Sequence, residues 1–258
     1  MIRNSTIWRS IIDEKCEIMN LSSGRALLAD TPRYKEASEG TLLASHLLSL
    51  SVMEILKIAF VYDVIYPGVK GGVEKRIYEL VIRLARSHEV HVYGYKHWKG
   101  PKDMERNGVY YHGLGNREKI YVFGKRNPLP MLRLAALLRR RIDELRRYDV
   151  VDVQNLFYPG AFALRDLSNA IITWHEFWGD YWLRYWGPAG MVGKAVERTL
   201  FSFDRHIAVS WKTKLDLLEA SLRKPITVVP NGIDVELIRS IPPAELESDV
   251  IFVGRLIP

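Results

Sequence analysis

Residues 67–74 read Pro-Gly-Val-Lys-Gly-Gly-Val-Glu, a composition typical of a loop that opens a helix. Gly71 and Gly72 let a ligand approach the backbone closely, and the free N–H groups at a helix N-terminus attract phosphate. No Gly-Lys-Ser/Thr follows, and the glycines lack the Gly-x-Gly-x-x-Gly spacing of dinucleotide-binding loops. Two interpretations stay open: a phosphate-facing loop, or a glycine-rich turn with Glu74 in the first turn of its helix.

Polar side chains follow two apolar runs at the points where the runs end. His175 and Glu176 come directly after residues 170–174, and Asn231 follows residues 226–229. An imidazole at such a position can hydrogen-bond a sugar or transfer a proton, although a lone histidine more often has a structural role. Asn-Gly pairs are typical of turns, so Asn231 by itself indicates only that a strand ends there.

Tryptophans recur every four residues from 174 to 186, which on a helix would form one stripe. Aromatic faces stack on sugars and also suit membrane interfaces. We consider Trp178 and Trp182, together with Glu176 and Asn231, as contacts for an acceptor or a sugar. The alternative is that the stripe packs against the core.

The elements that position these residues alternate in type from residue 56 onward, where short apolar runs are separated by longer helical patterns. Near-continuous apolarity indicates strands buried on both faces, and the repeated β-α order indicates a parallel sheet with helices on both sides. The expected fold class is α/β, a doubly wound Rossmann-like parallel sheet, whose ligands bind beyond the carboxyl ends of the strands. The predicted strands are residues 56–62, 90–93, 150–153, 170–174, 206–209 and 226–229, and the predicted helices are residues 73–87, 129–147, 191–201 and 210–222.

Composition restricts the partners and the compartment. The 258 residues carry 37 Lys and Arg against 30 Asp and Glu, a net charge of +7 that suits anionic partners. No nucleic-acid reader motif accompanies this charge, so nucleic acid is not an expected partner. The single cysteine, Cys16, permits no internal disulfide and no cysteine-built metal site. Because no apolar stretch approaches the roughly 20 residues of a spanning helix and no signal-peptide pattern is present, a cytoplasmic location is expected.

Several of these pieces occur together in the order and spacing of a known family. The chain resembles the N-terminal half of the retaining, nucleotide-sugar-dependent glycosyltransferases of family 4, which have the two-domain GT-B fold. Together the matching stretches extend over residues 56–258. They are Lys-Ile-Ala-Phe-Val-Tyr at 57–62, Gly-Gly-Val-Glu at 71–74, Thr-Trp-His-Glu at 173–176, Ala-Val-Ser at 208–210, Val-Val-Pro-Asn-Gly-Ile-Asp at 228–234 and Phe-Val-Gly-Arg-Leu at 252–256.

The resemblance implies roles for individual residues. Gly71 and Gly72 would face the donor's diphosphate and transferred sugar, His175 would hydrogen-bond the sugar as the catalytic residue, and Arg255 would help neutralise the leaving nucleoside diphosphate. A helix N-terminus and a guanidinium suit that developing charge without a metal ion. The resemblance also implies a front-face reaction with a donor such as a UDP- or GDP-sugar, so neither a dedicated nucleophile nor a cofactor is expected. The acceptor, a glycan, a lipid or a small molecule, would bind on this N-terminal side.

The two ends of the chain differ from its middle. Residues 1–52 form an N-terminal extension without strand-helix alternation, and Met53 is a candidate true start; a genuine N-terminal arm or docking segment is the alternative. Residues 53–241 are predicted to form the Rossmann-like domain, residues 242–249 a linker, and residues 250–258 the first strand of a C-terminal donor-binding domain. The lysine and paired glutamates that follow the Gly-Arg pair in the family are not in this chain. Unaided catalysis is therefore not expected, and a separately encoded C-terminal half is one way to complete the enzyme.

Residues 129–147 carry a run of arginines with two interpretations. An anionic membrane surface or a lipid-linked acceptor could be held by this charge at the inner membrane face, or the arginines form a solvated face. The arginines are Arg133, Arg139, Arg140, Arg141, Arg146 and Arg147.

Three function classes remain. The favoured class is a glycosyltransferase that acts with retention. The second is a noncatalytic acceptor-binding or regulatory subunit that needs a separately encoded C-terminal half. The third is another Rossmann-type enzyme, such as a nicotinamide-dependent dehydrogenase, against which the missing spaced-glycine pattern counts.

Overall fold

The computed structural model describes residues 54–116, 118, 121–122, 125–155, 158–242, 250 and 252. The predicted N-terminal extension with Met53, the candidate residue Arg255, and nearly all of the predicted linker and C-terminal strand lie outside these residues. In the part of the chain that is described, no helix combines the length and the apolar character needed to cross a bilayer.

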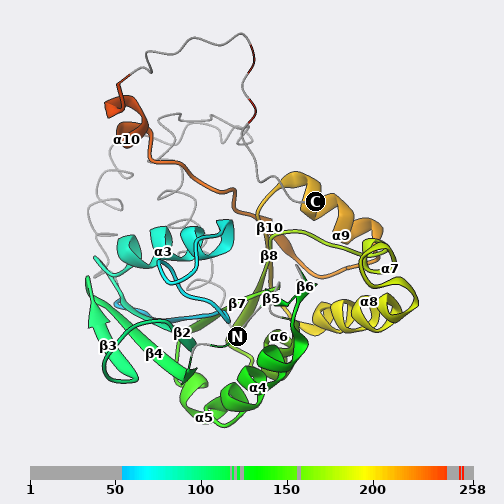
Figure 1. Cartoon of the computed structure of the whole chain (residues 1–258), viewed down its shortest axis with the longest axis horizontal. Helices are drawn as coiled ribbons and strands as arrows, with labels where there is room; N and C mark the ends of the chain where they lie inside the picture. The colour runs from blue at the N-terminus through cyan, green and yellow to red at the C-terminus, as the bar shows by residue number, and fades with distance from the viewer. Residues whose placement is uncertain are drawn as a thin grey trace, which may run out of the picture.

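An eight-stranded sheet forms the centre of the described residues, with the order β10-β9-β8-β7-β1-β2-β4-β3 (Figure 1). Neighbouring strands are parallel, apart from β3, which pairs antiparallel with β4. This arrangement confirms the predicted doubly wound parallel sheet. The strands of this sheet are β1 (Lys57–Val61), β2 (Glu89–Lys96), β3 (Asp103–Arg106), β4 (Val109–Asn116), β7 (Val150–Gln154), β8 (Ala170–Trp174), β9 (His206–Ala208) and β10 (Ile226–Val228).

Helices cover both faces of the sheet. Figure 1 shows α3 on one face and α4, α5 and α6 on the other. Because β2 lies on one side of β1 and β7 on the other, the strand order reverses at the carboxyl ends of β1 and β7, where doubly wound folds bind their ligands. The helices are α3 (Gly72–Leu84), α4 (Pro128–Arg139), α5 (Ile142–Leu145), α6 (Tyr158–Leu164), α7 (Tyr181–Trp186), α8 (Gly190–Thr199), α9 (Trp211–Glu219) and α10 (Val235–Ser240).

Local sequence explains where several helices begin. A side-chain oxygen caps the first turn of three of them by accepting a hydrogen bond from a backbone N–H group: Asn127 for α4, Ser210 for α9 and Asp234 for α10. The N-terminus of α3 differs, because its N-cap is Gly71 and no side chain of that residue can cap it.

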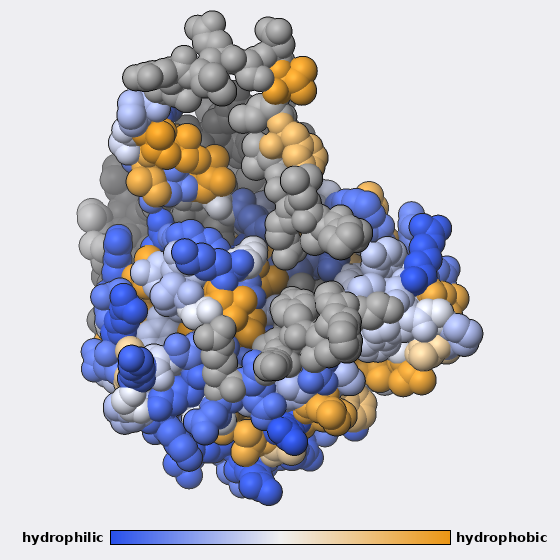
Figure 2. Space-filling view, in the orientation of Figure 1, coloured by the Kyte–Doolittle hydropathy of each residue, from blue (hydrophilic) through white to orange (hydrophobic). Residues whose placement is uncertain are grey.

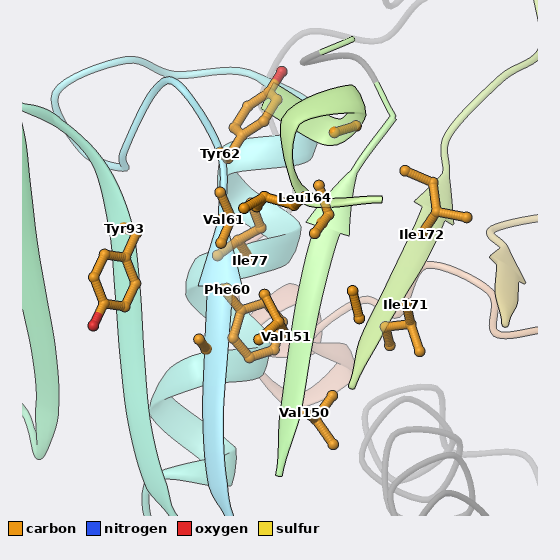
Figure 3. Close-up of a cluster of buried hydrophobic side chains, with 14 of the residues drawn as sticks. Phe60, Val61, Tyr62, Ile77, Tyr93, Val150, Val151, Leu164, Ile171 and Ile172 are labelled. Atoms are coloured by element: carbon orange, nitrogen blue, oxygen red, sulfur yellow. The ribbon is translucent and has the colours of Figure 1, made fainter. Parts of the chain in front are cut away.

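The core lies between the central strands and the helices packed on them. β7 and β8 are buried along their whole length, as their mostly apolar sequences predict. In Figure 3, Phe60 and Val61 of β1 lie with Ile77 of α3, Leu164 of α6 and the side chains of β7 and β8. Each fully buried side chain of this size stabilises the fold by about 1.5–3 kcal/mol.

The predicted helix at residues 129–147 is two helices in the structure. α4 ends at Arg139 and α5 begins at Ile142, with Arg141 outside the helical backbone region (φ −102°, ψ 11°). The break brings Leu145 and Tyr148 into the core, where both are buried. Burial of these two side chains outweighs the continuous helical pattern of the segment.

Other elements were not predicted. Besides β3, β4, α6, α7 and α10, these include a two-stranded hairpin of β5 (Tyr121–Val122) and β6 (Lys125–Arg126). After β10 the chain runs back to α10, above α3 (Figure 1). Leu237 and Ile238 of α10 and Ile241 directly after it are exposed, and they belong to an apolar patch at the upper left of Figure 2.

Candidate functional site

A chain of hydrogen bonds joins the carboxyl ends of β7 and β8. Nε2 of His175 lies 2.8 Å from Oε1 of Gln154, and Gln154 donates from Nε2 to Oδ1 of Asp152 over 3.0 Å. The hydroxyl of Thr173 donates to the same carboxylate oxygen over 2.6 Å. Asp152, Gln154 and Thr173 are buried. These hydrogen bonds therefore hold the imidazole from the buried side of the site.

This arrangement fixes the tautomer of His175. The carboxylate of Asp152 only accepts hydrogen bonds, so Gln154 must turn its amide group toward Asp152 and its carbonyl oxygen toward His175. The imidazole therefore carries its proton on Nε2 and presents Nδ1 as an acceptor. No other described residue hydrogen-bonds Nδ1.

The imidazole is neutral in the folded protein. Burial, reinforced by the nearby positive charge of Arg76, lowers the pKa of His175 to about 3. Arg76 belongs to α3, which begins at the same edge of the parallel sheet at which β8 ends. A neutral imidazole with a free acceptor nitrogen is suited to accept a hydrogen bond from a sugar hydroxyl.

The backbone around His175 is also fixed. Asn155, which follows β7, accepts a hydrogen bond from the backbone N–H of His175 over 2.9 Å and donates to the carbonyl oxygen of Glu176 over 2.8 Å. On the other side, the hydroxyl of Thr213 in α9 lies 3.4 Å from the carbonyl oxygen of His175. The side chain of Glu176 is exposed. The segment after β7 and the helix α9 thus hold the His175-Glu176 pair at the edge of the sheet.

The N-terminus of α3 is open at Gly72. A Cβ atom built on Gly72 meets no atom within 4 Å, whereas one built on Gly71 would overlap the carboxylate of Glu74. Glu74 therefore folds back over Gly71, as the third residue of a helix does in a capping box. The space at Gly72 allows a ligand to approach the first turn of α3.

Arg76 joins α3 to the loop after β10. Its guanidinium donates to the carbonyl oxygens of Val229 and Pro230, over 3.2 and 3.1 Å, and to Oδ1 of Asn231 over 2.8 Å. Asn231 is therefore brought to α3, although 155 residues separate it from Arg76. Because Oδ1 of Asn231 is used in this contact, its Nδ2 amide is the group left for a ligand.

The tryptophans do not form one helical stripe. Trp174 lies in β8 and is fully buried, Trp178 lies in the following loop, and Trp182 and Trp186 lie in α7. Trp182 is 5% exposed and packs on Trp178, with ring centroids 4.7 Å apart. Trp178 is partly exposed. The structure thus places Trp182 in the core and leaves Trp178 at the surface.

A buried carboxylate organises this aromatic segment. Glu197 of α8 is 0% exposed and accepts four hydrogen bonds, from the hydroxyl of Tyr158, the backbone N–H groups of Trp178 and Gly179, and Nε1 of Trp182. Burial raises the pKa of Glu197 despite these donors. The segment after His175 is therefore tied to α8.

The structure places most of the candidate residues in two groups at one edge of the sheet: Gly71, Gly72 and Asn231 lie around α3, while His175, Glu176 and Trp178 follow β8. No group of three or more His, Cys, Asp and Glu that could hold a metal ion occurs among the described residues.

The sequence analysis missed several residues of the site. Gln154 and Asn155 directly follow a predicted strand, so their place at its carboxyl end was a usable signal. Arg76 and Glu197 lie within helical patterns, and nothing in the sequence distinguishes them from solvated charges.

Comparison with known proteins adds a family and a fold. The model of the family described as Glycosyltransferase Family 4 matches residues 70–237, more than half of the chain. Sucrose-phosphate synthase from Thermosynechococcus elongatus has a similar fold, with 14% sequence identity and a TM-score of 0.50 over 68% of this chain and 48% of that chain. An α,α-trehalose-phosphate synthase (UDP-forming) from Burkholderia vietnamiensis gives 16% identity and a TM-score of 0.47 over 68% and 47%.

The chain spans less than half of the length of these two solved structures. Among curated proteins, no sequence match is found.

Proposed function

Because the chain belongs to glycosyltransferase family 4, we propose that it supplies the acceptor-side half of an enzyme that transfers a sugar, with retention, from a nucleotide-sugar to a glycan, lipid or small-molecule acceptor. One observation carries this proposal. The open N-terminus of α3 and the neutral imidazole of His175 lie at the same edge of the sheet, where doubly wound folds bind their ligands.

His175 is the proposed catalytic residue. With its proton on Nε2 held by Gln154, the imidazole accepts a hydrogen bond at Nδ1 from a hydroxyl of the transferred sugar. Its low pKa means that it does not supply a proton near neutral pH. The role that fits is orientation of the sugar while the bond to the diphosphate breaks.

Charge that develops on the diphosphate needs a separate stabiliser. The Gly71-Gly72 loop, open at Gly72, together with the positive end of α3, is the proposed group on this side of the donor. On the basis of the sequence pattern around it, Arg255 is proposed to neutralise the leaving nucleoside diphosphate. Glu176, Trp178 and the Nδ2 amide of Asn231 are the proposed contacts to the acceptor or the transferred sugar.

A peripheral contact with a membrane stays a proposal. Leu129 and Leu132 of α4 are exposed at 61% and 55%, and Arg133 follows them on the same helix. Against this, four arginines of the predicted basic run already form ion pairs, with Glu118, Asp166, Glu144 and Asp143. Co-sedimentation with anionic and neutral vesicles tests the proposal, which requires binding to the anionic vesicles alone.

The native protein, purified with any C-terminal half that accompanies it, provides the test of function. Its intact mass shows whether a second domain is attached, and incubation with UDP- and GDP-sugars shows whether nucleoside diphosphate is released. We expect release that His175→Ala reduces strongly. Acceptor binding without release from any donor would support the noncatalytic subunit instead, and binding of NAD in place of UDP or GDP would support a dehydrogenase.

A further inference from the structure

A cavity of about 360 Å³ lies beside the segment that follows His175. This volume is within the range of roughly 300–1,000 Å³ typical of ligand sites. The cavity opens between α8, α9 and the loop that joins β8 to α7, elements that lie together at the right of Figure 1. Its lining includes Phe177, Trp178 and Gly179 from the loop, Lys194 and Arg198 from α8, and Lys212, Asp216 and Glu219 from α9.

One wall of the cavity is aromatic and is held in place. The backbone N–H groups of Trp178 and Gly179 donate to the two carboxylate oxygens of Glu197, over 2.9 and 2.8 Å. Trp178 is further fixed by edge contacts with Tyr181 and Tyr185, each with ring centroids 5.0 Å apart. The aromatic side chains of this wall are therefore fixed before a ligand binds. This lowers the entropic cost of binding.

The remaining lining is polar and balanced in charge. Lys194 pairs with Asp180 and Lys212 pairs with Asp216, whereas Arg198 and Glu219 form no ion pair with any described residue. Three cations therefore face three carboxylates. Carboxylates accept hydrogen bonds and ammonium and guanidinium groups donate them, so the lining suits a neutral ligand with many hydroxyl groups. An anionic ligand would gain no net attraction from a lining whose positive and negative charges balance.

The cavity shares Trp178 with the candidate site. Its wall begins at Phe177, two positions after His175, and α9 also reaches the backbone of His175 through Thr213.

We propose that this cavity binds a neutral hexopyranose ring of the acceptor glycan, stacked on the Phe177-Trp178 wall and hydrogen-bonded by Arg198, Asp216 and Glu219. The assignment of this sugar to the acceptor rests on the proposed function. Binding of the sugar itself does not.

Ligand-observed NMR on the 258-residue chain tests the binding without any donor nucleotide. The probes are the methyl glycosides of glucose, galactose, mannose and N-acetylglucosamine, with glucose 6-phosphate as an anionic comparison. We expect saturation transfer to at least one methyl glycoside and weaker transfer to glucose 6-phosphate. Absence of transfer to all the methyl glycosides, or a preference for the phosphate, overturns the proposal.

Variants place the bound sugar in the cavity. Asp216→Asn and Glu219→Gln each remove a charged acceptor from α9, and loss of a hydrogen bond to a charged group weakens binding by about tenfold or more. The control is Glu236→Gln on α10, which exchanges an exposed carboxylate outside the cavity. Equal affinity in all three variants would overturn the proposal. These experiments measure sugar binding and not the transfer of a sugar from a donor. A failure of binding is therefore distinguishable from a failure of the proposed transferase activity.

Discussion

Nε2 of His175 lies 2.8 Å from Oε1 of Gln154, a contact that fixes which nitrogen of the imidazole carries the proton. The hydrogen bonds from Gln154 to Asp152 and from His175 to Gln154 leave Nδ1 of His175 as the acceptor. Burial and Arg76 keep the ring neutral. His175, which follows β8 at the ligand-binding edge of the sheet, can therefore accept a hydrogen bond at Nδ1.

The protonation of His175 is expected to stay constant across the physiological pH range. Because its pKa in the folded protein is about 3, nitrogen NMR should show the neutral Nε2–H form down to about pH 5. In Gln154→Leu the carbonyl acceptor is lost, and both tautomers should appear. A His175 signal that titrates near its ordinary pKa of about 6.5 would contradict this assignment.

Acid should destabilise the fold through two histidines. Burial lowers the pKa of His175 to about 3 and that of His206 to about 4, so the unfolded chain binds more protons than the folded chain below about pH 6.5. Their stabilising contribution is present above that pH and is lost as the pH falls toward the folded-state values. Each should lower the free energy of unfolding by up to about 2 kcal/mol between about pH 7.5 and pH 5.

Urea unfolding at the two pH values measures this effect. In His206→Gln the loss between them should be smaller than in the wild type. The same loss in both proteins would show that other groups cause the acid sensitivity.

Gly72→Val should separate activity from stability. A side chain at Gly72 enters open space, so the melting temperature should change little, whereas the added methyl groups block approach to the first turn of α3. In the completed two-domain enzyme we expect turnover to be abolished. Full turnover in this variant would remove the loop from the site.

Arg76→Lys should loosen the loop after β10. A lysine cannot reproduce the fork of a guanidinium, so at least one of the acceptors at Val229, Pro230 and Asn231 loses its donor. We expect a loss of about 1–3 kcal/mol in the free energy of unfolding and faster hydrogen exchange at residues 229–234.

Arg86→Ala is the matched control for that variant, because Arg86 is an exposed residue just beyond the same helix. Its exchange at residues 229–234 should equal that of the wild type. Unchanged exchange in Arg76→Lys would show that the contact does not hold the loop.

Gly193→Ala should displace Trp182. A Cβ atom at Gly193 would overlap the indole ring of Trp182, and overpacking of a core costs about 1–3 kcal/mol. We expect a lower urea midpoint and a shifted tryptophan emission. Val192→Ala alters an exposed position one residue earlier in α8 and should leave both unchanged; equal effects in the two variants would argue against the close contact.

The sequence predicted the elements whose own apolar residues indicate that they are buried. Mostly apolar runs identified β7 and β8, because strands buried on both faces are rich in apolar side chains. The edge strand β3, in contrast, has the sequence Asp-Met-Glu-Arg and is largely exposed. Nothing in that composition distinguishes it from a loop, so pairing with β4 decides its conformation.

For the site, the sequence determined which residues stand at strand ends, and His175, Glu176 and Asn231 followed from that. Only the tertiary structure decided what holds them. The register that sets Gln154 opposite Thr173 brings Gln154 to His175, and the return of the chain after β10 brings Asn231 to Arg76, 155 residues away. Local pattern encodes burial and backbone conformation, whereas these contacts depend on how separate elements are placed against one another in space.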